Sequence, residues 1–229
     1  MQRIFLFLFF LALASNGLYS QVFNAFDSEG KRHGKWQKKY DNSDQIRYEG
    51  TFDHGKEIGE FKFYKPNSGK IPTAIKIFSK DNDSVQLKYY TARGKVISEG
   101  KMLGKDRVGI WVYYHRGSTK VMMTEEYKQG KLYGEQKTYF ENGQLTEKTV
   151  YVNGEKQGKR IVYSEKGIMI KEFTYENDQL HGVTKYYDAN GNVQIEGNYK
   201  RDRKDGVWNY YENGKLIEQK RFPIEKSRS

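Results

Sequence analysis

The sequence contains no cysteine, only three prolines and no long apolar segment among its 229 residues. The absence of cysteine excludes disulfide bonds, thiolate-bound zinc, a cysteine nucleophile and the lipidated cysteine of a bacterial lipoprotein. Hydrophobic residues make up only 36% of the chain, and charged residues make up 30%. These proportions exclude a multispanning membrane protein and do not suit a large globular core. An architecture that exposes much of its surface is therefore favoured.

Aromatic residues are abundant, in contrast, and account for 15% of the chain through 19 Tyr, 13 Phe and 3 Trp. Disordered chains are poor in such residues, so we expect a folded protein. The formal net charge is +11, from 40 Lys and Arg against 29 Asp and Glu. This excess favours acidic partners, among which nucleic acid, anionic lipid and acidic proteins all qualify.

Residues 1–20 have the organisation of a secretory signal peptide. Arg3 precedes an apolar run of 11 residues, Ile4 to Ala14, and small polar residues follow up to Ser20. The run is about half as long as a membrane-spanning helix, and this order of segments is typical of a cleaved signal. We expect cleavage after Ser20, with cleavage after Ala14, an uncleaved anchor and a buried helix as alternatives. The prediction is an exported protein, periplasmic or extracellular, with no stable transmembrane segment after cleavage.

The rest of the chain is an internal repeat. A glycine followed by an aromatic cluster recurs every 24 or 25 residues, with one gap of 50 residues between Gly59 and Gly109. That gap holds one degenerate unit, in which Ser84 takes the glycine position and Tyr89 and Tyr90 supply the aromatic end. Eight units therefore fill residues 21–223. The marker glycines are Gly34, Gly59, Gly109, Gly134, Gly158, Gly182 and Gly206.

Each unit reads as a β-hairpin. Asn-Gly pairs at 142–143, 190–191 and 213–214 predict tight type I′ turns, because this turn needs two positive φ values. Alternating residues follow each turn, as in the series Leu145, Glu147, Thr149 and Tyr151, and a period of two indicates a strand. A hairpin of about 24 residues cannot bury its own face, but stacked hairpins can.

The aromatic positions divide between the two faces of the predicted sheet. Rings two and four residues after the marker glycine point to one side, where they can build a thin continuous core. A tyrosine five residues after the marker glycine points to the other side and offers a binding surface. The predicted core residues are Trp36, Phe61, Trp111, Tyr113, Tyr186, Trp208 and Tyr210. The predicted binding surface consists of Tyr64, Tyr114, Tyr139, Tyr163, Tyr187 and Tyr211.

The repeated pattern resembles the bacterial variant of the MORN repeat. Three segments carry the resemblance most clearly, at residues 141–145, 151–158 and 212–216. The resemblance implies an all-β protein, an elongated and twisted antiparallel β-meander of about eight stacked hairpins, without catalytic residues. It also implies a role in scaffolding, protein binding or phospholipid contact, and some bacterial members are grouped as antitoxin components of toxin–antitoxin modules.

The four histidines have no spacing typical of a metal or catalytic site. His33, His54, His115 and His181 are each more than four residues from the next, and His33 and His181 directly precede marker glycines. We expect all four to be solvent-facing turn residues, because stacked hairpins should keep them apart. The acidic run at residues 81–84 lacks the later residues of an EF-hand loop and is predicted to be a solvated turn.

Glutamates recur five residues after the hairpin turn, at Glu99, Glu172 and Glu196. Paired carboxylates can act as acid and base in a cleft, but repetition in successive units predicts a ladder of Glu among Lys and Tyr of neighbouring strands. Phosphate-binding loops and nucleophile motifs are absent from the sequence. We therefore expect no enzyme activity, no cofactor and no metal.

These observations predict a non-enzymatic exported scaffold, formed by residues 21–223, that binds a protein or an envelope component. The alternatives are an antitoxin or immunity protein that neutralises a toxin by direct binding, an anionic phospholipid-binding surface protein, and a glycan hydrolase. Basic residues cluster at 200–204 and 220–228, and the second cluster overlaps a basic C-terminal tail at 224–229. These clusters would suit lipid head groups. Lysines also alternate with tyrosines, as in single-strand binding surfaces, but export argues against a nucleic-acid partner.

Overall fold

A computed structural model describes residues 22–79 and 82–223 of the chain. The described residues contain nineteen strands and no helix. The strands are β1 (Ala25–Phe26), β2 (Arg32–Lys39), β3 (Ile46–Asp53), β4 (Lys56–Phe63), β5 (Ala74–Phe78), β6 (Ser84–Tyr90), β7 (Val96–Leu103), β8 (Asp106–Tyr114), β9 (Val121–Lys128), β10 (Lys131–Leu132), β11 (Gly134–Tyr139), β12 (Leu145–Val152), β13 (Glu155–Tyr163), β14 (Met169–Glu176), β15 (Gln179–Leu180), β16 (Gly182–Tyr187), β17 (Val193–Lys200), β18 (Arg203–Glu212) and β19 (Lys215–Phe222).

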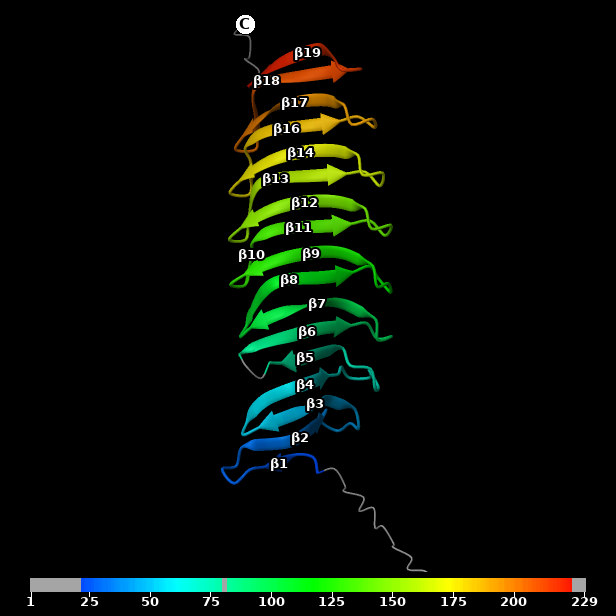
Figure 1. Cartoon of the computed structure of the whole chain (residues 1–229), viewed down its shortest axis with the longest axis vertical. Helices are drawn as coiled ribbons and strands as arrows, with labels where there is room; N and C mark the ends of the chain where they lie inside the picture. Colours follow the sequence, from blue (N-terminus) through cyan, green and yellow to red (C-terminus); the bar gives the residue numbers. More distant parts are fainter. Residues whose placement is uncertain (1–21, 80–81, 224–229) are drawn as a thin grey trace, which may run out of the picture.

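All strands belong to one open antiparallel sheet, in which each strand pairs with the strand before it along the chain, except that β11 pairs with β9 past β10 and β16 pairs with β14 past β15. The meander continues in the same way to β19. The result is a long stack of hairpins (Figure 1). Three strands, β1, β10 and β15, have two residues each, and the other sixteen form eight hairpins. The predicted all-β meander of stacked hairpins is confirmed.

The marker glycine is needed because the register between strands shifts beside it. Gly109 has a φ of 64°, a conformation that glycine adopts without strain. The pairing of β7 with β8 shifts there, from Glu99 opposite Val112 to Lys101 opposite Val108. A bulge of this kind strengthens the local twist of the strands.

The hairpin turns are of two kinds, and the prediction of type I′ turns was wrong for two of the three Asn-Gly pairs. Asn213 and Gly214 both have positive φ, 50° and 73°, as type I′ requires. At residues 142–143 and 190–191 only the glycine has positive φ. There Asn142 uses its side chain instead, because its Oδ1 accepts the Gln144 N–H at 2.9 Å. The turn is therefore a three-residue turn closed by a glycine bulge.

The core is one row of side chains on one face of the sheet. Its largest members are rings that lie on glycines of the preceding strand: Phe61 on Gly50, Trp111 on Gly100 and Trp208 on Gly197. Phe61, Trp111 and Trp208 are fully buried. The other predicted core residues lie in the sheet half-buried: Trp36, Tyr113, Tyr186 and Tyr210.

The middle of the row is polar. Gln136 and Arg160 occupy the position that Trp111 and Trp208 occupy in their own hairpins, and they face Thr149 and Phe173. Thr149 is fully buried there. The continuous aromatic core predicted from the repeat is thus interrupted over β11 to β13.

The predicted signal peptide (1–20) and basic tail (224–229) lie outside the described residues. Within the described part of the chain, no helix is long and apolar enough to cross a membrane.

Candidate binding surface

The sheet has two unlike faces. Glu99 and Gly100 are neighbours in β7, so their side-chain directions are opposite. Gly100 lies under the ring of Trp111. We call the face with Trp111 and Trp208 the ring face, and the face with Glu99 the tyrosine face.

A ladder of hydrogen bonds runs along the tyrosine face. In four hairpins, the tyrosine that follows the marker glycine by five residues donates its hydroxyl to a glutamate 15 residues earlier. The pairs are Tyr64 with Glu49 (2.6 Å), Tyr114 with Glu99, Tyr187 with Glu172 (3.4 Å) and Tyr211 with Glu196 (2.8 Å). Glu99, Glu172 and Glu196 therefore lie in a ladder, as their repetition predicted.

Lysines complete the ladder. Lys88 lies 2.8 Å from Glu99, Lys159 lies 2.7 Å from Glu172, and Lys185 lies 3.7 Å from Glu196. The ammonium of Lys88, followed by the Tyr114 hydroxyl, holds the pKa of Glu99 below its usual value. The hydrogen bond to Glu99 in turn raises the pKa of Tyr114 to about 12. The carboxylates of Glu99, Glu172 and Glu196 are already occupied by donors, which suits a structural ladder.

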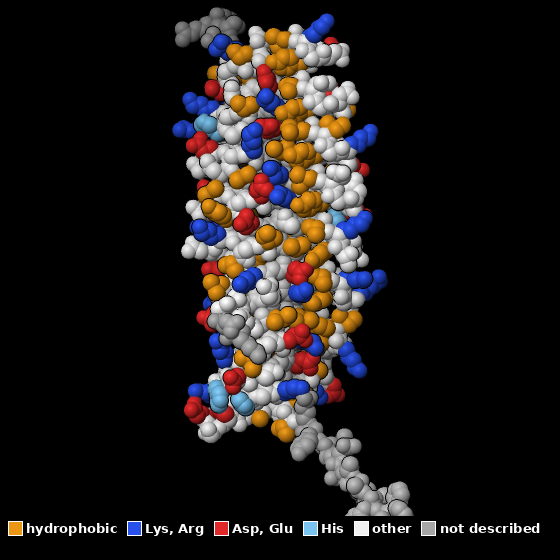
Figure 2. Space-filling model, viewed as in Figure 1, with side chains coloured by type: hydrophobic (Ala, Val, Ile, Leu, Met, Phe, Trp, Pro, Cys, Tyr) orange, Lys and Arg blue, Asp and Glu red, His pale blue; other side chains and the backbone are white. Residues whose placement is uncertain are grey.

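A stripe of tyrosines and aliphatic side chains runs beside this ladder. In each of five successive hairpins, a tyrosine at the end of the first strand lies directly opposite an aliphatic residue of the second strand, on the same face. The pairs are Tyr114 with Val121, Tyr139 with Leu145, Tyr163 with Met169, Tyr187 with Val193 and Tyr211 with Leu216. We call these ten residues the tyrosine stripe. Figure 2 shows the tyrosine face, with a hydrophobic band along its length and a column of Lys and Glu beside it.

The ladder is broken in the middle of the stripe. The residues 15 positions before Tyr139 and Tyr163 are Thr124 and Lys148, not glutamates. Among the described residues, none forms a hydrogen bond with the hydroxyl of Tyr139 or Tyr163. A hollow of about 430 Å³ lies against Val121, Thr124 and Tyr139. The stripe thus holds two half-buried tyrosines with free hydroxyls, and one of them, Tyr139, lies against an open hollow.

Tyr64 differs from the other predicted surface tyrosines, because it is only 7% exposed. Its hydroxyl is held by Glu49, and its carbonyl accepts the Tyr40 hydroxyl at 2.7 Å. Burial and the nearby Glu49 carboxylate raise the pKa of Tyr64. The ring is therefore part of the interior at this end of the sheet. The remaining five predicted tyrosines are half-buried and all lie in the tyrosine stripe.

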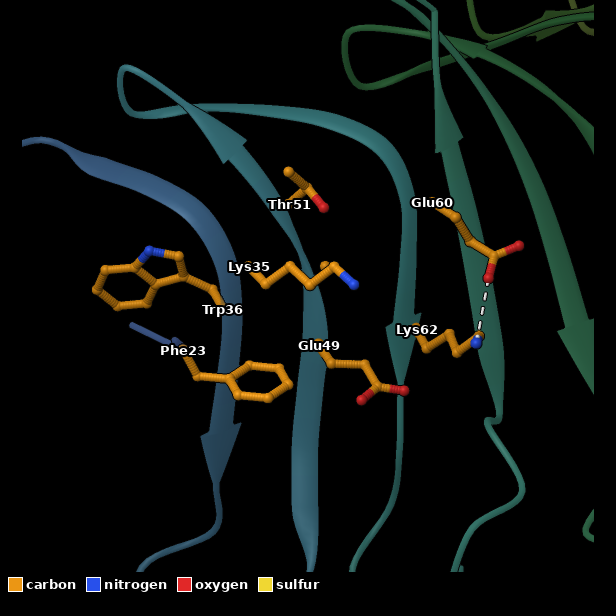
Figure 3. Close-up of a pocket in the computed structure, with 8 residues that line it drawn as sticks. Phe23, Lys35, Trp36, Glu49, Thr51, Glu60 and Lys62 are labelled. Atoms are coloured by element: carbon orange, nitrogen blue, oxygen red, sulfur yellow. Dashed lines mark ion pairs between the residues drawn. The ribbon is translucent and has the colours of Figure 1, made fainter. Parts of the chain in front are cut away.

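The stripe does not continue into the first hairpins. A hollow of about 360 Å³ lies there instead. Figure 3 shows Phe23 beside Glu49 in this hollow, with Lys35, Glu60 and Lys62 around it. Lys62 and Glu60 form an ion pair at 3.2 Å. This end of the tyrosine face is charged and internally paired.

The repeats agree with one known family. The family model of the MORN repeat variant matches residues 132–153, 180–201 and 204–222. The chain is similar to this family over these three segments. Each match begins two residues before a marker glycine, at Gly134, Gly182 and Gly206, so the family's unit coincides with the hairpin seen in the structure. MORN repeats are generally found in binding or scaffold proteins and are generally non-enzymatic. No curated protein matches the chain.

One buried polar group in the sheet was not predicted from the sequence. Glu125 on the ring face is 9% exposed, and its Oε2 accepts the hydroxyls of Tyr113 and Tyr127, each at 2.7 Å. Its Oε1 accepts the Gln136 amide at 2.9 Å, and Arg107 lies 4.0 Å away. The available signal was Gln136, a polar residue at the position where Trp111 and Trp208 stand in their own hairpins. The carboxylate is saturated with donors, so it stabilises the polar part of the core.

The expectation that stacked hairpins keep the histidines apart was wrong for one pair. The rings of His33 and His54 are 4.9 Å apart. Gly34 pairs with Phe52 across the β2–β3 hairpin, which brings the residue before Gly34 beside the turn after Phe52. The other two histidines stand alone: His115 contacts the Tyr139 carbonyl at 3.1 Å, and His181 lies 3.3 Å from Glu176.

Proposed function

We propose that this protein is a non-enzymatic, exported scaffold that binds another protein through the tyrosine stripe. The observation that carries the proposal is the stripe itself, in which five tyrosines and five aliphatic residues follow one another over successive hairpins. Tyrosine is enriched in protein interfaces, because its ring offers apolar area and its hydroxyl offers a hydrogen bond. Tyr139 and Tyr163, with free hydroxyls, form the centre of the proposed interface.

The charge beside the stripe favours a protein over an anionic membrane. Binding to anionic lipid needs clusters of unpaired cations. On the tyrosine face, Lys88, Lys159 and Lys185 are each matched by a glutamate within 4.0 Å. The face therefore offers alternating charges, which suit a partner with complementary charges of both signs. An envelope protein is the partner class we propose.

An antitoxin or immunity function would use the same surface, with a toxin as the partner. No contact in the structure favours this narrower function. A gene for a secreted toxin next to this one would favour it over a general scaffold.

The binding surface can be tested by capture from envelope fractions. The double variant Tyr139→Ser, Tyr163→Ser removes the two central rings without removing a glutamate of the ladder. Ile110→Ser is a matched control, because Ile110 is 63% exposed. As the neighbour of Trp111 in β8, Ile110 points away from the ring face, so it lies on the tyrosine face but outside the stripe. We expect the wild type and the control to retain a protein, which is identified by mass spectrometry and then titrated as a purified partner. The double variant should lose this protein while it still unfolds cooperatively above the temperature of the assay. Equal affinity of all three would overturn the proposal, and binding to phosphatidylglycerol vesicles alone would favour the lipid alternative.

Export rests on Arg3 and the apolar run from Ile4 to Ala14. Mass spectrometry of the protein made in a native-like host should find a mature N-terminus near Gln21. Recovery of the chain with intact Met1 from the cytoplasm would contradict export.

A further inference from the structure

The turn between β3 and β4 brings two histidines and an aspartate together. His33 Nδ1 lies 3.5 Å from Asp53 Oδ1, and His54 Nε2 lies 3.8 Å from the same oxygen. One ligand atom from each of these three residues lies within 4.8 Å of the others. We propose that His33, Asp53 and His54 bind one divalent transition-metal ion of the zinc class.

The distances from Asp53 to the two histidine nitrogens fit a tetrahedral ion. Zinc binds imidazole nitrogen and carboxylate oxygen at about 2.0 to 2.2 Å, so two ligand atoms of a tetrahedral site are roughly 3.4 Å apart. The distances of 3.5 and 3.8 Å to Asp53 Oδ1 are close to this value. Two imidazoles and one carboxylate suit Zn²⁺, Ni²⁺ or Cu²⁺, whereas Ca²⁺ and Mg²⁺ prefer oxygen ligands alone.

A second carboxylate holds one of the rings in the orientation that a metal ligand needs. Asp27 Oδ2 lies 2.7 Å from His54 Nδ1, and the Asp27 side chain is only 7% exposed. Its Oδ1 accepts the N–H groups of Glu29 and Lys31 at 3.0 and 2.8 Å, which fixes the carboxylate. A carboxylate that accepts a hydrogen bond from Nδ1–H leaves the lone pair on Nε2, the nitrogen nearer Asp53. Metal-binding histidines commonly have such a partner.

The backbone holds the turn in place. His54 has a φ of 45°, and Gly55 donates its N–H to the Arg32 carbonyl at 2.8 Å, which ties the turn to the start of β2. A metal ion would add a second tie between β2 and this turn and, through Asp27, to the segment before β2. Terminal repeats have a neighbour on one side only and need capping. The side chains of His33, Asp53 and His54 are 47%, 55% and 65% exposed, which leaves room for a water ligand at the fourth position.

The chain supplies a matched control in another repeat. His181 precedes Gly182 as His33 precedes Gly34. Phe52 lies opposite Gly34 as Tyr199 lies opposite Gly182, so the positions that correspond to Asp53 and His54 are Lys200 and Arg201. These two side chains are cationic and cannot bind a metal cation. His181→Gln should therefore leave metal binding unchanged.

The test is calorimetric titration of the untagged, chelator-treated protein with ZnCl₂. We expect one Zn²⁺ per chain in the wild type and in His181→Gln, and loss of saturable binding in His33→Gln and in His54→Asn. Asparagine suits position 54, because Asn153 occupies the corresponding turn position with a φ of 53°. Asp27→Asn should weaken binding by about 10 to 100-fold, and Tm in EDTA should be unchanged in His33→Gln and His181→Gln.

Co²⁺ gives a second readout, because a tetrahedral site produces visible absorption that a merely structural role for these residues would not produce. We expect the absorption in the wild type and in His181→Gln and its loss in His33→Gln. Absence of saturable Zn²⁺ binding to the wild type, or binding that survives both histidine substitutions, would overturn the proposal.

Discussion

The indole ring of Trp208 lies directly on the backbone of Gly197, so that a Cβ atom at residue 197 would be 2.3 Å from Cδ2 of the ring. Trp111 lies on Gly100 in the same way and at the same distance. Such contacts let a single-layer sheet bury a large ring, because the missing side chain of the glycine makes room for it. The stability of the sheet therefore depends on pairs of one ring and one glycine.

Gly197→Ala should destabilise the protein by about 1 to 3 kcal/mol, the usual cost of overpacking. The φ of Gly197 is not positive, so the cost is steric and not due to backbone strain. Urea unfolding measures the change in free energy. In a Trp208→Leu background the smaller side chain leaves room for the methyl group, so the two substitutions together should cost less than their sum. An equal cost of Gly197→Ala in both backgrounds would contradict the packing described.

Trp111→Ala should lower the free energy of unfolding by about 3 to 5 kcal/mol, because it removes a fully buried ring. His181→Ala is the comparison, with an expected loss of about 0.5 kcal/mol or less, since its side chain is 40% exposed. Thermal unfolding of both variants measures the difference. An unchanged Tm in Trp111→Ala together with lost partner binding would make the ring a site residue.

The Tyr114–Glu99 pair predicts a dependence of stability on pH. The pKa of Tyr114 is raised from 10.0 to about 12 in the folded state, because its hydroxyl donates to Glu99. The protonated tyrosine is therefore favoured by folding, and its contribution is fully present below about pH 10 and lost as the pH rises through about 12. The pKa of Glu99 is lowered, so the carboxylate stabilises the fold above its usual pKa of 4.5 and this is lost in acid.

The stability difference between wild type and Tyr114→Phe, measured by chemical unfolding, should shrink between pH 10 and 12. Ultraviolet titration of the wild type should show one more late-titrating tyrosine than the variant does. A constant difference across this range would show that the hydrogen bond to Glu99 does not favour the protonated tyrosine.

The fold was predictable because the same pattern of glycines, turns and alternating residues recurs in successive units of the chain. The spacing of marker glycines gave eight hairpins, and the resemblance to MORN repeats agreed. The turn at residues 142–143 was not predictable from Asn-Gly alone, because the Asn142 side chain competes with the type I′ backbone by bonding Gln144. Whether an Asn-Gly pair forms a type I′ turn or a three-residue turn depends on all the residues of the loop, not on the pair alone.

The candidate site was predictable only in part. Five of the six predicted surface tyrosines share one stripe, but Tyr64 is buried. Its hydrogen bonds join it to Tyr40, 24 residues away, and to Glu49, 15 residues away, and such contacts cannot be read from the repeat. The approach of His33 to His54 needs the β2–β3 register, which spacing within the sequence does not give. Glu125 was overlooked because its donors come from three strands, β8, β9 and β11.

Small-angle scattering on the monomeric chain beginning at Gln21 tests the central claim most directly, since an open stack of hairpins must be elongated for its stripe to remain uncovered. Sixteen strands at about 4.8 Å each predict a sheet about 75 Å long, and a rod of that length has a radius of gyration of about 22 Å or more. A compact globule of the same chain length would have a radius of gyration of about 17 Å. The account predicts the larger value, and a radius near 17 Å would contradict it.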